Sequence, residues 1–342
     1  MAATLFAAVL LFTFPVKATV SAEKAILIDA ETGRVIYEKQ ADSRALIAST
    51  TKIMTALIIC EQCNVLDRVR IPKEAVGIEG SSMYLKEGEV LTVQELLYGL
   101  MLQSGNDAAV ALAIYCAGTV EGFVQLMNDK ANRLALINTH FENPNGLDSP
   151  GHYSTARDMA ALASYAMQNP IFRQTVSAKK IAFGNRTLTN HNKLLWRIDG
   201  ADGVKTGFTR AAGRTLVSSV SRDGRRLIAV TLNASNDWND HASLYEVGFR
   251  DYNVKRLVEK GDCVGYTEIA GGQGGLVELT ADEDFTYVLR AEEIAEFVPQ
   301  APGFVYAPVC KGQSAGFVYI MVDHNVIGKI SVLYGQTVEK NG

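Results

Sequence analysis

Apolar and polar positions follow two different periods along the chain, and the change of period separates expected strands from expected helices. Residues 25–29 and 35–37 are short β-rich runs on either side of Glu31-Thr32-Gly33, a pattern typical of a hairpin. Thr92 and Glu95 have the spacing of a capping box, which marks the start of a helix. Helical character is predicted for four stretches, namely residues 50–60, 93–102, 108–117 and 123–136. The chain therefore begins with strands and continues with helices.

The same patterns organise the middle of the chain. Asn143-Pro144-Asn145-Gly146 is a turn cluster between helices. Residues 155–158 cap a further helix, which is expected to stop at Asn169-Pro170. Strand patterns then return around two tight-turn signals, Gly184-Asn185 and Asp223-Gly224. The order of strands, helices and strands predicts a sheet whose middle helices form an inserted lobe.

The last part of the chain has a different character, with short strand-like runs between glycine and proline turns. These runs include residues 271–275, 277–279, 285–288 and 317–320. About 80 residues of this kind favour a small β-sandwich or meander. The predicted fold class is therefore α+β, with a first domain over residues 23–254 and an all-β domain over residues 255–342.

The first segment has the pattern of an export signal. Residues 1–16 carry no charged side chain, and Val20-Ser21-Ala22 offers a small-residue cleavage site. We expect a signal peptide over residues 1–22 and an exported mature protein; a buried N-terminal helix is the alternative. No uncharged apolar run reaches the roughly 18 to 20 residues of a membrane-spanning helix.

Composition and charge exclude several classes of protein. The chain has 33 Lys and Arg against 37 Asp and Glu, a formal net charge of −4, which argues against a nucleic-acid-binding protein. Hydrophobic residues make up 48% of the 342 positions and charged residues 20%, which argues against disorder.

Cysteine and histidine usage gives no support for a metal or cofactor. The five cysteines, Cys60, Cys63, Cys116, Cys263 and Cys310, are too sparse for a disulfide scaffold. Cys60 and Cys63 have the spacing of a metal or redox pair, but no second pair or histidine cluster accompanies them. We interpret them as a helix-end pair, and we expect neither a metal nor another cofactor.

An S-x-x-K pattern occurs three times, and only one copy has suitable geometry for chemistry. Ser21 to Lys24 straddles the expected cleavage site, and Ser177 to Lys180 leads into a strand, where positions i and i+3 face opposite ways. Ser49 and Lys52 instead stand at the start of a predicted helix, where i and i+3 share a face. Free backbone N–H groups at such a helix start can also stabilise negative charge.

Two further motifs complete a candidate active site. A serine hydroxyl needs a base, and a neutral Lys52 could serve if a second cation lowered its pKa. Lys205-Thr206-Gly207 supplies that cation together with a carboxylate-binding pair and a glycine that a substrate can approach closely. Ser104-Gly105-Asn106 offers a hydroxyl and an amide from a loop between two helices. Singly these motifs could be a helix cap, a strand start and an ordinary turn; in this order they indicate one site.

The ordered set of S-x-x-K, S-x-N and K-T-G resembles the signature of penicillin-binding proteins and class A β-lactamases. The flanking residues are most similar to the low-molecular-mass serine-type D-alanyl-D-alanine carboxypeptidases of the peptidase S11 type. That similarity lies in residues 25–33, 48–56, 143–147, 202–209 and 222–228, and in the β-rich tail around 307–312. It covers nearly all of the mature chain.

The resemblance implies a peptidase that forms an acyl-enzyme. Ser49 would attack the peptide bond between two terminal D-alanines of a peptidoglycan stem pentapeptide, and Lys52 would take its proton. Ser104 would relay a proton to the leaving nitrogen, while Asn106 would orient Lys52 and the substrate amide. β-Lactams would acylate Ser49 by the same route.

The resemblance also implies how the substrate is held. Lys205 and Thr206 would bind the terminal carboxylate, with Gly207 beside the substrate backbone. The backbone N–H groups of Ser49 and Phe208 would form the oxyanion hole. Peptidoglycan stem peptides ending in D-Ala-D-Ala and inhibitory β-lactams would be the ligands, in the cell envelope or outside the cell, and nucleic acid would not be one.

Three positions depart from the family pattern. Phe208 stands where a histidine often follows K-T-G, and His191 stands where an arginine is common. The family often ends in an amphipathic anchoring helix, whereas this chain ends at residues 338–342, so peripheral membrane association is not evident. The first two changes predict altered electrostatics in the cleft.

Two other functions remain open from the sequence. A β-lactamase would need a Glu-x-x-Leu-Asn segment to activate the deacylating water, and none lies between Ser104 and Lys205. A β-lactam or peptidoglycan-binding protein without turnover is the other alternative. D-alanine release from a D-Ala-D-Ala peptide would separate these possibilities.

Overall fold

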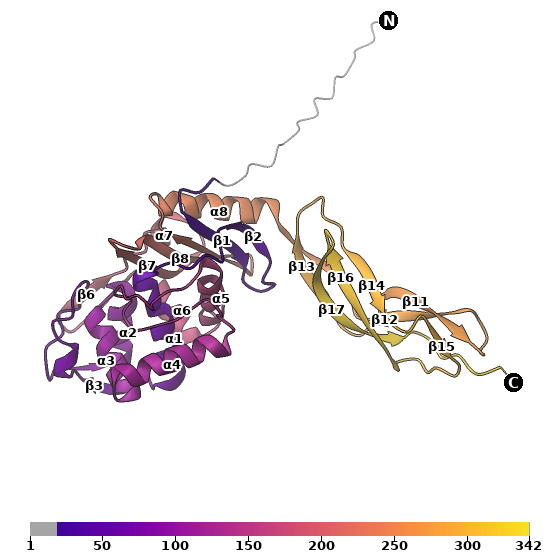
Figure 1. The fold of residues 1–342 in the computed structure, drawn as a ribbon, viewed down its shortest axis with the longest axis horizontal. Coiled ribbons are helices and arrows are strands. Elements are labelled where there is room, and N and C mark those ends of the chain that lie inside the picture. The colour runs from indigo at the N-terminus through magenta and orange to yellow at the C-terminus, as the bar shows by residue number, and fades with distance from the viewer. Residues whose placement is uncertain (1–18, 342) are drawn as a thin grey trace, which may run out of the picture. The chain divides into compact units, whose positions relative to one another are not determined.

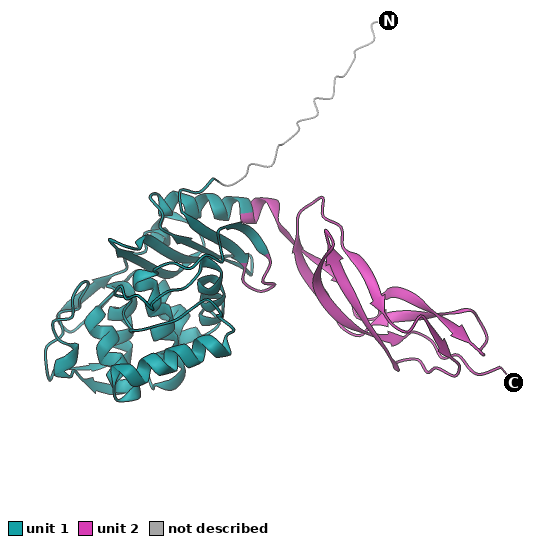
Figure 2. Cartoon of the chain, in the orientation of Figure 1, with its two compact units in different colours: residues 1–28, 35–247 teal, residues 29–34, 248–342 magenta. Residues whose placement is uncertain are grey.

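The computed structural model describes residues 19–341, which form two compact units. The first unit includes residues 35–247 and the segment up to residue 28; the second comprises residues 29–34 and 248–342 (Figure 2). The domain boundary expected after residue 254 falls inside β10 (Asn253–Val258), whose residues pair with β13 (Phe285–Leu289) in the second unit. The apolar part of the expected signal peptide lies outside the described residues.

A five-stranded sheet is the centre of the first unit, with strand order β2-β1-β9-β8-β7 (Figure 1). Two hairpins predicted from turn signals are confirmed in it, since β1 pairs with β2 and β8 pairs with β9, both antiparallel. The strands are β1 (Lys24–Asp29), β2 (Val35–Lys39), β7 (Ala201–Thr209), β8 (Gly213–Arg222) and β9 (Arg225–Leu232). Asp223 and Gly224 both have positive φ, at 49° and 79°, which is the backbone geometry of a tight hairpin turn.

The helices between β2 and β7 pack on one face of this sheet, as the predicted inserted lobe (Figure 1). They are α1 (Lys52–Gln62), α2 (Val93–Leu102), α3 (Asn106–Ala117), α4 (Val120–Arg133), α5 (Ala156–Ala166), α6 (Pro170–Ser177) and α7 (Leu194–Arg197). Short pieces complete the lobe: η1 (Ala48–Thr51), η2 (Lys73–Ala75), and the strand pairs β3 (Arg68–Arg70) with β4 (Val90–Thr92) and β5 (Lys180–Phe183) with β6 (Arg186–Thr189). The capping box of Thr92 and Glu95 at the start of α2 is confirmed.

The structure confirms one predicted helix boundary and corrects another. The helix capped at Thr155 ends before Asn169-Pro170, since α5 stops at Ala166. These two residues also start a further helix that was not predicted: the Asn169 side chain accepts hydrogen bonds from two backbone N–H groups, and Pro170 begins α6. Proline suits a first helical position because its missing N–H has no partner there. The prediction that Ser49 begins the α-helix is wrong, because a 3-10 turn (η1) precedes α1, whose first residue is Lys52.

The helix α8 (Asp237–Asp251) covers the opposite face of the sheet and was absent from the sequence-based prediction (Figure 1). Its buried positions Asp237, Asp240, His241, Leu244 and Tyr245 recur at helical spacing, but three of the five are polar. The sequence of α8 therefore lacks the apolar periodicity that predicts an amphipathic helix. Asp237, Asp240 and His241 form hydrogen bonds within the folded protein instead.

His241 makes the main polar contact between α8 and the sheet. Its Nδ1 lies 2.6 Å from the Ser218 hydroxyl, and its Nε2 lies 2.9 Å from the Thr231 hydroxyl. The Ser218 hydroxyl also contacts the Tyr245 hydroxyl at 2.6 Å. Complete burial lowers the pKa of His241 to about 3, so this histidine is neutral in the folded protein.

We expect the free energy of unfolding to fall as the pH is lowered below 6.5, partly because of His241. Its pKa is about 3 in the folded state against an ordinary value of 6.5, so the unfolded chain binds more protons between these values. The loss is on the order of 1.4 kcal/mol per pH unit within this window, and none arises above it. Urea denaturation at several pH values should show a shallower pH dependence for His241→Gln than for the wild type. Parallel pH profiles would contradict this assignment.

The segment at residues 20–22 is part of the first unit. Asp240 accepts hydrogen bonds from the backbone N–H and hydroxyl of Ser21, at 2.8 and 2.7 Å, and from the backbone N–H of Ala22. Lys39 donates to the Ala22 carbonyl at 2.7 Å. Cleavage after Ala22 would remove the contacts of Ser21, so the exact cleavage site stays a prediction.

Apart from the last turn of α8, the second unit is all-β, as predicted. A six-stranded sheet has the order β14-β16-β17-β12-β11-β15, and β10 and β13 form a separate pair. Alternate residues of the central strands, such as Val277 and Leu279 or Val318 and Ile320, are fully buried in its core. The six strands are β11 (Cys263–Ala270), β12 (Leu276–Ala281), β14 (Glu296–Gln300), β15 (Phe304–Tyr306), β16 (Ser314–Val322) and β17 (Asn325–Tyr334). The predicted α+β fold class with an all-β C-terminal unit is confirmed.

Within residues 19–341, we find no single helix that has both the length and the apolar composition needed to cross a membrane. The bent pair of α3 and α4 passes this test only when the two helices are taken together, by length and composition alone.

Candidate active site

The Ser49 hydroxyl and the Lys52 amine lie side by side, one turn apart. The Lys52 Nζ is 3.0 Å from the Ser49 Oγ, because η1 runs directly into α1 and places both side chains on one face. Side-chain hydrogen bonds hold the η1 turn: the Thr50 hydroxyl donates to the Ile47 carbonyl at 2.6 Å, and the Thr51 hydroxyl donates to the Ala48 carbonyl at 2.8 Å.

The remaining contacts of Lys52 fix the orientation of its amine. Its Nζ is fully buried and lies 2.7 Å from the Asn106 Oδ1 and 2.5 Å from the Asn145 backbone carbonyl. Both oxygens can only accept hydrogen bonds. A neutral Lys52 amine would therefore donate its two protons to Asn106 and Asn145, and its lone pair would face the Ser49 hydroxyl. This is the arrangement that a base next to a nucleophile requires.

The electrostatics of the site favour that neutral form. Burial holds the pKa of Lys52 well below its usual range, and the charge of Lys205 lowers it further, while Asp107 acts in the opposite direction. Burial also lowers the pKa of Lys205, to about 7. Two buried cations near each other disfavour double protonation, so the charge of Lys205 helps to keep the amine beside Ser49 neutral.

The S-x-N segment connects α2 to α3, as predicted, and it supplies the Asn106 side chain that contacts Lys52. Ser104 is buried with a φ of 60°, and Asn106 is the first residue of α3. The Asn106 amide nitrogen donates to the Glu79 carbonyl at 2.6 Å, which directs its Oδ1 towards Lys52. The Ser104 hydroxyl makes no hydrogen bond to Lys52 or Lys205 in the described part of the chain.

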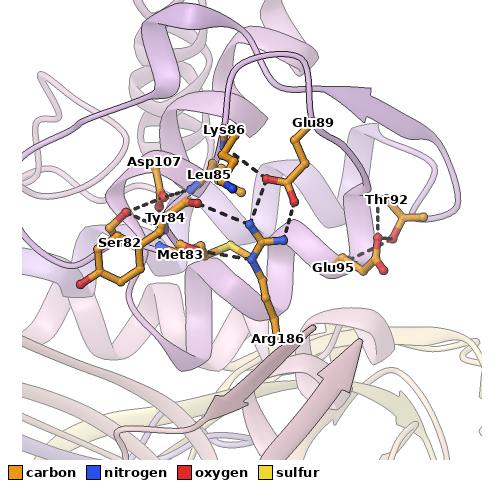
Figure 3. Close-up of polar contacts among 10 residues, drawn as sticks. All are labelled: Ser82, Met83, Tyr84, Leu85, Lys86, Glu89, Thr92, Glu95, Asp107 and Arg186. Atoms are coloured by element: carbon orange, nitrogen blue, oxygen red, sulfur yellow. Dashed lines mark hydrogen bonds and ion pairs between the residues drawn. The ribbon is translucent and has the colours of Figure 1, made fainter. Parts of the chain in front are cut away.

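Two side chains from other elements hold the loop that follows Glu79, the backbone partner of Asn106 (Figure 3). Asp107 accepts hydrogen bonds from the Ser82 hydroxyl and from the backbone N–H groups of Met83 and Leu85. Arg186 forms a two-pronged ion pair with Glu89, at 2.5 and 2.9 Å, from the other side. The backbone partner of Asn106 is therefore part of a fixed loop.

The K-T-G motif lies on β7, at the edge of the sheet and against η1. Lys205 is buried and its Nζ donates to the Thr206 carbonyl at 2.9 Å. A Cβ added to Gly207 would lie 2.9 Å from the Ser49 backbone nitrogen, so only glycine allows this close approach. Phe208 is 65% exposed. As the last strand in the sheet order, β7 has a backbone edge that can bind an extended peptide.

His191 lies near this strand. Its side chain is accessible to solvent, and partial burial followed by the charge of Lys205 lowers its pKa. A mainly neutral His191 would contribute less positive charge to the cleft than the arginine that is common at this position.

Sequence patterns alone missed several residues around Lys52. Asn145 acts through a backbone carbonyl, which no residue type reveals, although the turn cluster at 143–146 marked the place. Asp107 directly follows the S-x-N motif, so its position was visible but its role was not. His152, which contacts Thr51, carried no signal in the sequence.

The described residues include no group of three or more His, Cys, Asp or Glu side chains that could hold a metal ion. The five cysteines are free thiols, and the two of the C-x-x-C pattern differ in position: Cys60 is buried on α1, while Cys63 follows the end of that helix and is only partly buried.

Comparison with known proteins shows similarity over both units. The family model for D-alanyl-D-alanine carboxypeptidase matches residues 12–236, and the model for the penicillin-binding protein 5 C-terminal domain matches residues 252–340. The chain is 34% identical over 337 residues to D-alanyl-D-alanine carboxypeptidase DacF of Bacillus subtilis (strain 168), covering 94% of this chain and 87% of DacF. It is 33% identical over 344 residues to D-alanyl-D-alanine carboxypeptidase DacC of Escherichia coli (strain K12), covering 95% and 86%. The crystal structure of D-alanyl-D-alanine carboxypeptidase DacD from Francisella tularensis matches with a TM-score of 0.81 at 27% identity, covering 98% of both chains.

Proposed function

Because the chain belongs to the peptidase S11 family of serine-type D-alanyl-D-alanine carboxypeptidases, we propose that Ser49 is its nucleophile and Lys52 its general base. The observation that carries this proposal is the buried Lys52 Nζ, 3.0 Å from the Ser49 Oγ with acceptor oxygens on its other sides. The lysine lone pair can then take the serine proton as the hydroxyl attacks.

The substrate is a peptidoglycan stem pentapeptide that ends in D-Ala-D-Ala. Lys205 and Thr206 bind its terminal carboxylate, and its backbone aligns along β7 next to Gly207. The Ser49 oxygen attacks the carbonyl between the two D-alanines, and the backbone N–H groups of Ser49 and Phe208 stabilise the oxyanion. These donors supply the transition-state stabilisation that binding of the ground state does not require.

The intermediate collapses when the leaving nitrogen receives a proton. Lys52 holds the proton taken from Ser49, and the Ser104 hydroxyl relays it to the departing D-alanine, while Asn106 keeps the amine aligned. Water then attacks the acyl-enzyme, with Lys52 again as the base, and releases the shortened peptide. A β-lactam acylates Ser49 in the same way and acts as an inhibitor.

We infer that the protein is exported and acts outside the cytoplasm. The family acts on peptidoglycan, which lies in the cell envelope, and the apolar segment at residues 1–16 has the pattern of a signal peptide. Intact-mass measurement after incubation with benzylpenicillin, followed by mapping of the modified peptide, tests the nucleophile. D-alanine release from a D-Ala-D-Ala peptide tests the turnover. Labelling without release would favour a binding protein, and rapid β-lactam hydrolysis would favour a β-lactamase.

We expect Lys205→Gln to weaken recognition of the substrate's carboxylate specifically. The variant keeps a polar side chain, one atom shorter, but removes the positive charge, so kcat/KM for a peptide with a free terminal carboxylate should fall roughly 10- to 100-fold. The effect on the corresponding C-terminal amide should be much smaller.

Comparing the peptide that has a free carboxylate with its C-terminal amide separates carboxylate binding from an indirect effect of Lys205 on Lys52. Loss of the Lys205 charge also raises the pKa of Lys52, because that charge helps to lower it. This change affects both peptides equally and cancels in the ratio of their kcat/KM values. An equal loss for the carboxylate and the amide would refute the role of Lys205 in carboxylate binding.

A further inference from the structure

A buried histidine is linked to the nucleophile turn by a directed chain of hydrogen bonds. The Glu142 backbone N–H donates to the His152 Nδ1 at 3.1 Å, and the His152 Nε2 lies 2.7 Å from the Thr51 hydroxyl. That hydroxyl contacts the Ala48 carbonyl at 2.8 Å. His152 is 1% exposed and Thr51 is fully buried, so water does not compete for these contacts.

The direction of every proton in this chain follows from its first member. A backbone N–H can only donate, so the His152 Nδ1 must accept and the neutral ring carries its proton on Nε2. The Nε2–H therefore donates to the Thr51 oxygen. The Thr51 proton is then free to donate to the Ala48 carbonyl, which can only accept.

The Ala48 carbonyl belongs to the same peptide group as the Ser49 N–H. Because a peptide group is planar and trans, the direction of its carbonyl fixes the direction of its N–H. Two glycines confine the group: a Cβ on Gly146 would lie 2.0 Å from the Ala48 oxygen, and one on Gly207 would lie 2.9 Å from the Ser49 nitrogen. Ala48 itself has a φ of 46°, which an alanine rarely adopts, so its conformation needs external support.

From this geometry we propose that His152 is a positioning residue, which acts through Thr51 and the Ala48 carbonyl to aim the Ser49 N–H at the substrate oxyanion. The inference rests on the proposed function of Ser49. It assigns to His152 a part in stabilising the transition state, without contact with the substrate. The hydrogen bond to the Ala48 carbonyl also polarises the peptide group and strengthens the Ser49 N–H as a donor.

Substitutions at His152 separate this role from simple packing. His152→Phe keeps the ring that packs against Phe141, with ring centroids 5.7 Å apart, but removes both hydrogen bonds. We expect it to lower kcat for D-alanine release and the rate constant of acylation by benzylpenicillin roughly 10- to 100-fold, with KM changed less than about threefold. His152→Gln can still donate to Thr51 through its amide and should recover most of the loss.

A double-mutant cycle tests whether His152 acts through Thr51. Thr51→Val should give a loss similar to that of His152→Phe, and the double variant should lose little more, because both substitutions break one chain. His140→Gln is the matched control: this histidine donates from Nδ1 to the Gly151 carbonyl at 2.7 Å in the same loop, and within residues 19–341 its side chain makes no hydrogen bond to η1. It should leave both rates unchanged.

The infrared carbonyl band of the penicilloyl-enzyme is a direct readout of the oxyanion hole. Weaker or misdirected hydrogen bonding in His152→Phe and Thr51→Val should move this band to higher frequency, and His152→Gln should restore it. Should His152→Phe fail to fold, Thr51→Val and His152→Gln decide the question alone.

Failure of this inference differs from failure of the proposed function. If the wild type is labelled at Ser49 but folded Thr51→Val acylates at the wild-type rate with an unshifted band, His152 has no positioning role and Ser49 remains the nucleophile. If the wild type is labelled at another residue, the proposed nucleophile is wrong, and the positioning role of His152 is overturned with it.

Discussion

Ser49→Ala is expected to abolish D-alanine release and covalent labelling by penicillin. The variant lacks the hydroxyl that lies 3.0 Å from the Lys52 amine, and loss of a serine nucleophile of this kind costs roughly 10⁴- to 10⁶-fold in kcat. Alanine removes one oxygen from a half-buried position, so the fold should persist. The measurement is intact mass after incubation with benzylpenicillin, together with D-alanine release.

The chain contains its own control for this experiment. Ser177 opens another S-x-x-K pattern, but it ends α6, and its hydroxyl donates to the Gln174 carbonyl on its own helix. Ser177→Ala should therefore be labelled and turn over like the wild type. Continued penicillin labelling of Ser49→Ala would assign the nucleophile to another residue.

Lys52→Met is expected to give the second-largest loss, roughly 10²- to 10⁴-fold in the acylation rate, because it removes the base. Methionine still fills the space of the lysine side chain up to Cε. Lys52→Arg should be nearly as inactive, since a guanidinium does not deprotonate in a protein and cannot accept the Ser49 proton. If positive charge at this position were the requirement, Lys52→Arg would retain activity, and the role of a general base would be wrong.

The pH dependence of acylation should also show whether Lys52 is the general base. Only the neutral Lys52 amine can accept a proton, so the acylation rate should rise as the pH increases through the lowered pKa of this group. This rise should be absent from the residual activity of Lys52→Met. Lys180→Met, at the exposed lysine of the Ser177 pattern, is the control and should keep the wild-type profile.

The sequence was most informative where local geometry decides the structure. The i, i+3 spacing of Ser49 and Lys52 predicted a shared face, and it holds even though the first of these residues lies in a 3-10 turn. The capping box at Thr92 and the turn at Asp223-Gly224 were also correct, because each depends on residues only a few positions apart.

Sequence patterns failed where polar groups are buried or where the contacting group is backbone. The helix α8 was missed because three of its buried positions are Asp237, Asp240 and His241, which interrupt the apolar period. The carbonyl of Asn145 next to Lys52 was missed because every residue type offers the same backbone oxygen.

By itself, the sequence determined the α+β fold class, the family, and the three motifs of the candidate site in their order. Only the tertiary structure decided how those motifs act on one another. Lys205 on β7 lowers the pKa of Lys52, which lies 153 positions earlier in the sequence. His152 contacts Thr51, in the η1 turn that contains Ser49. Spacing along a helix or across a hairpin specifies contacts between near neighbours. Burial and the meeting of charges from distant segments exist only once the chain has folded, and these decide which amine is neutral and which N–H can stabilise an oxyanion.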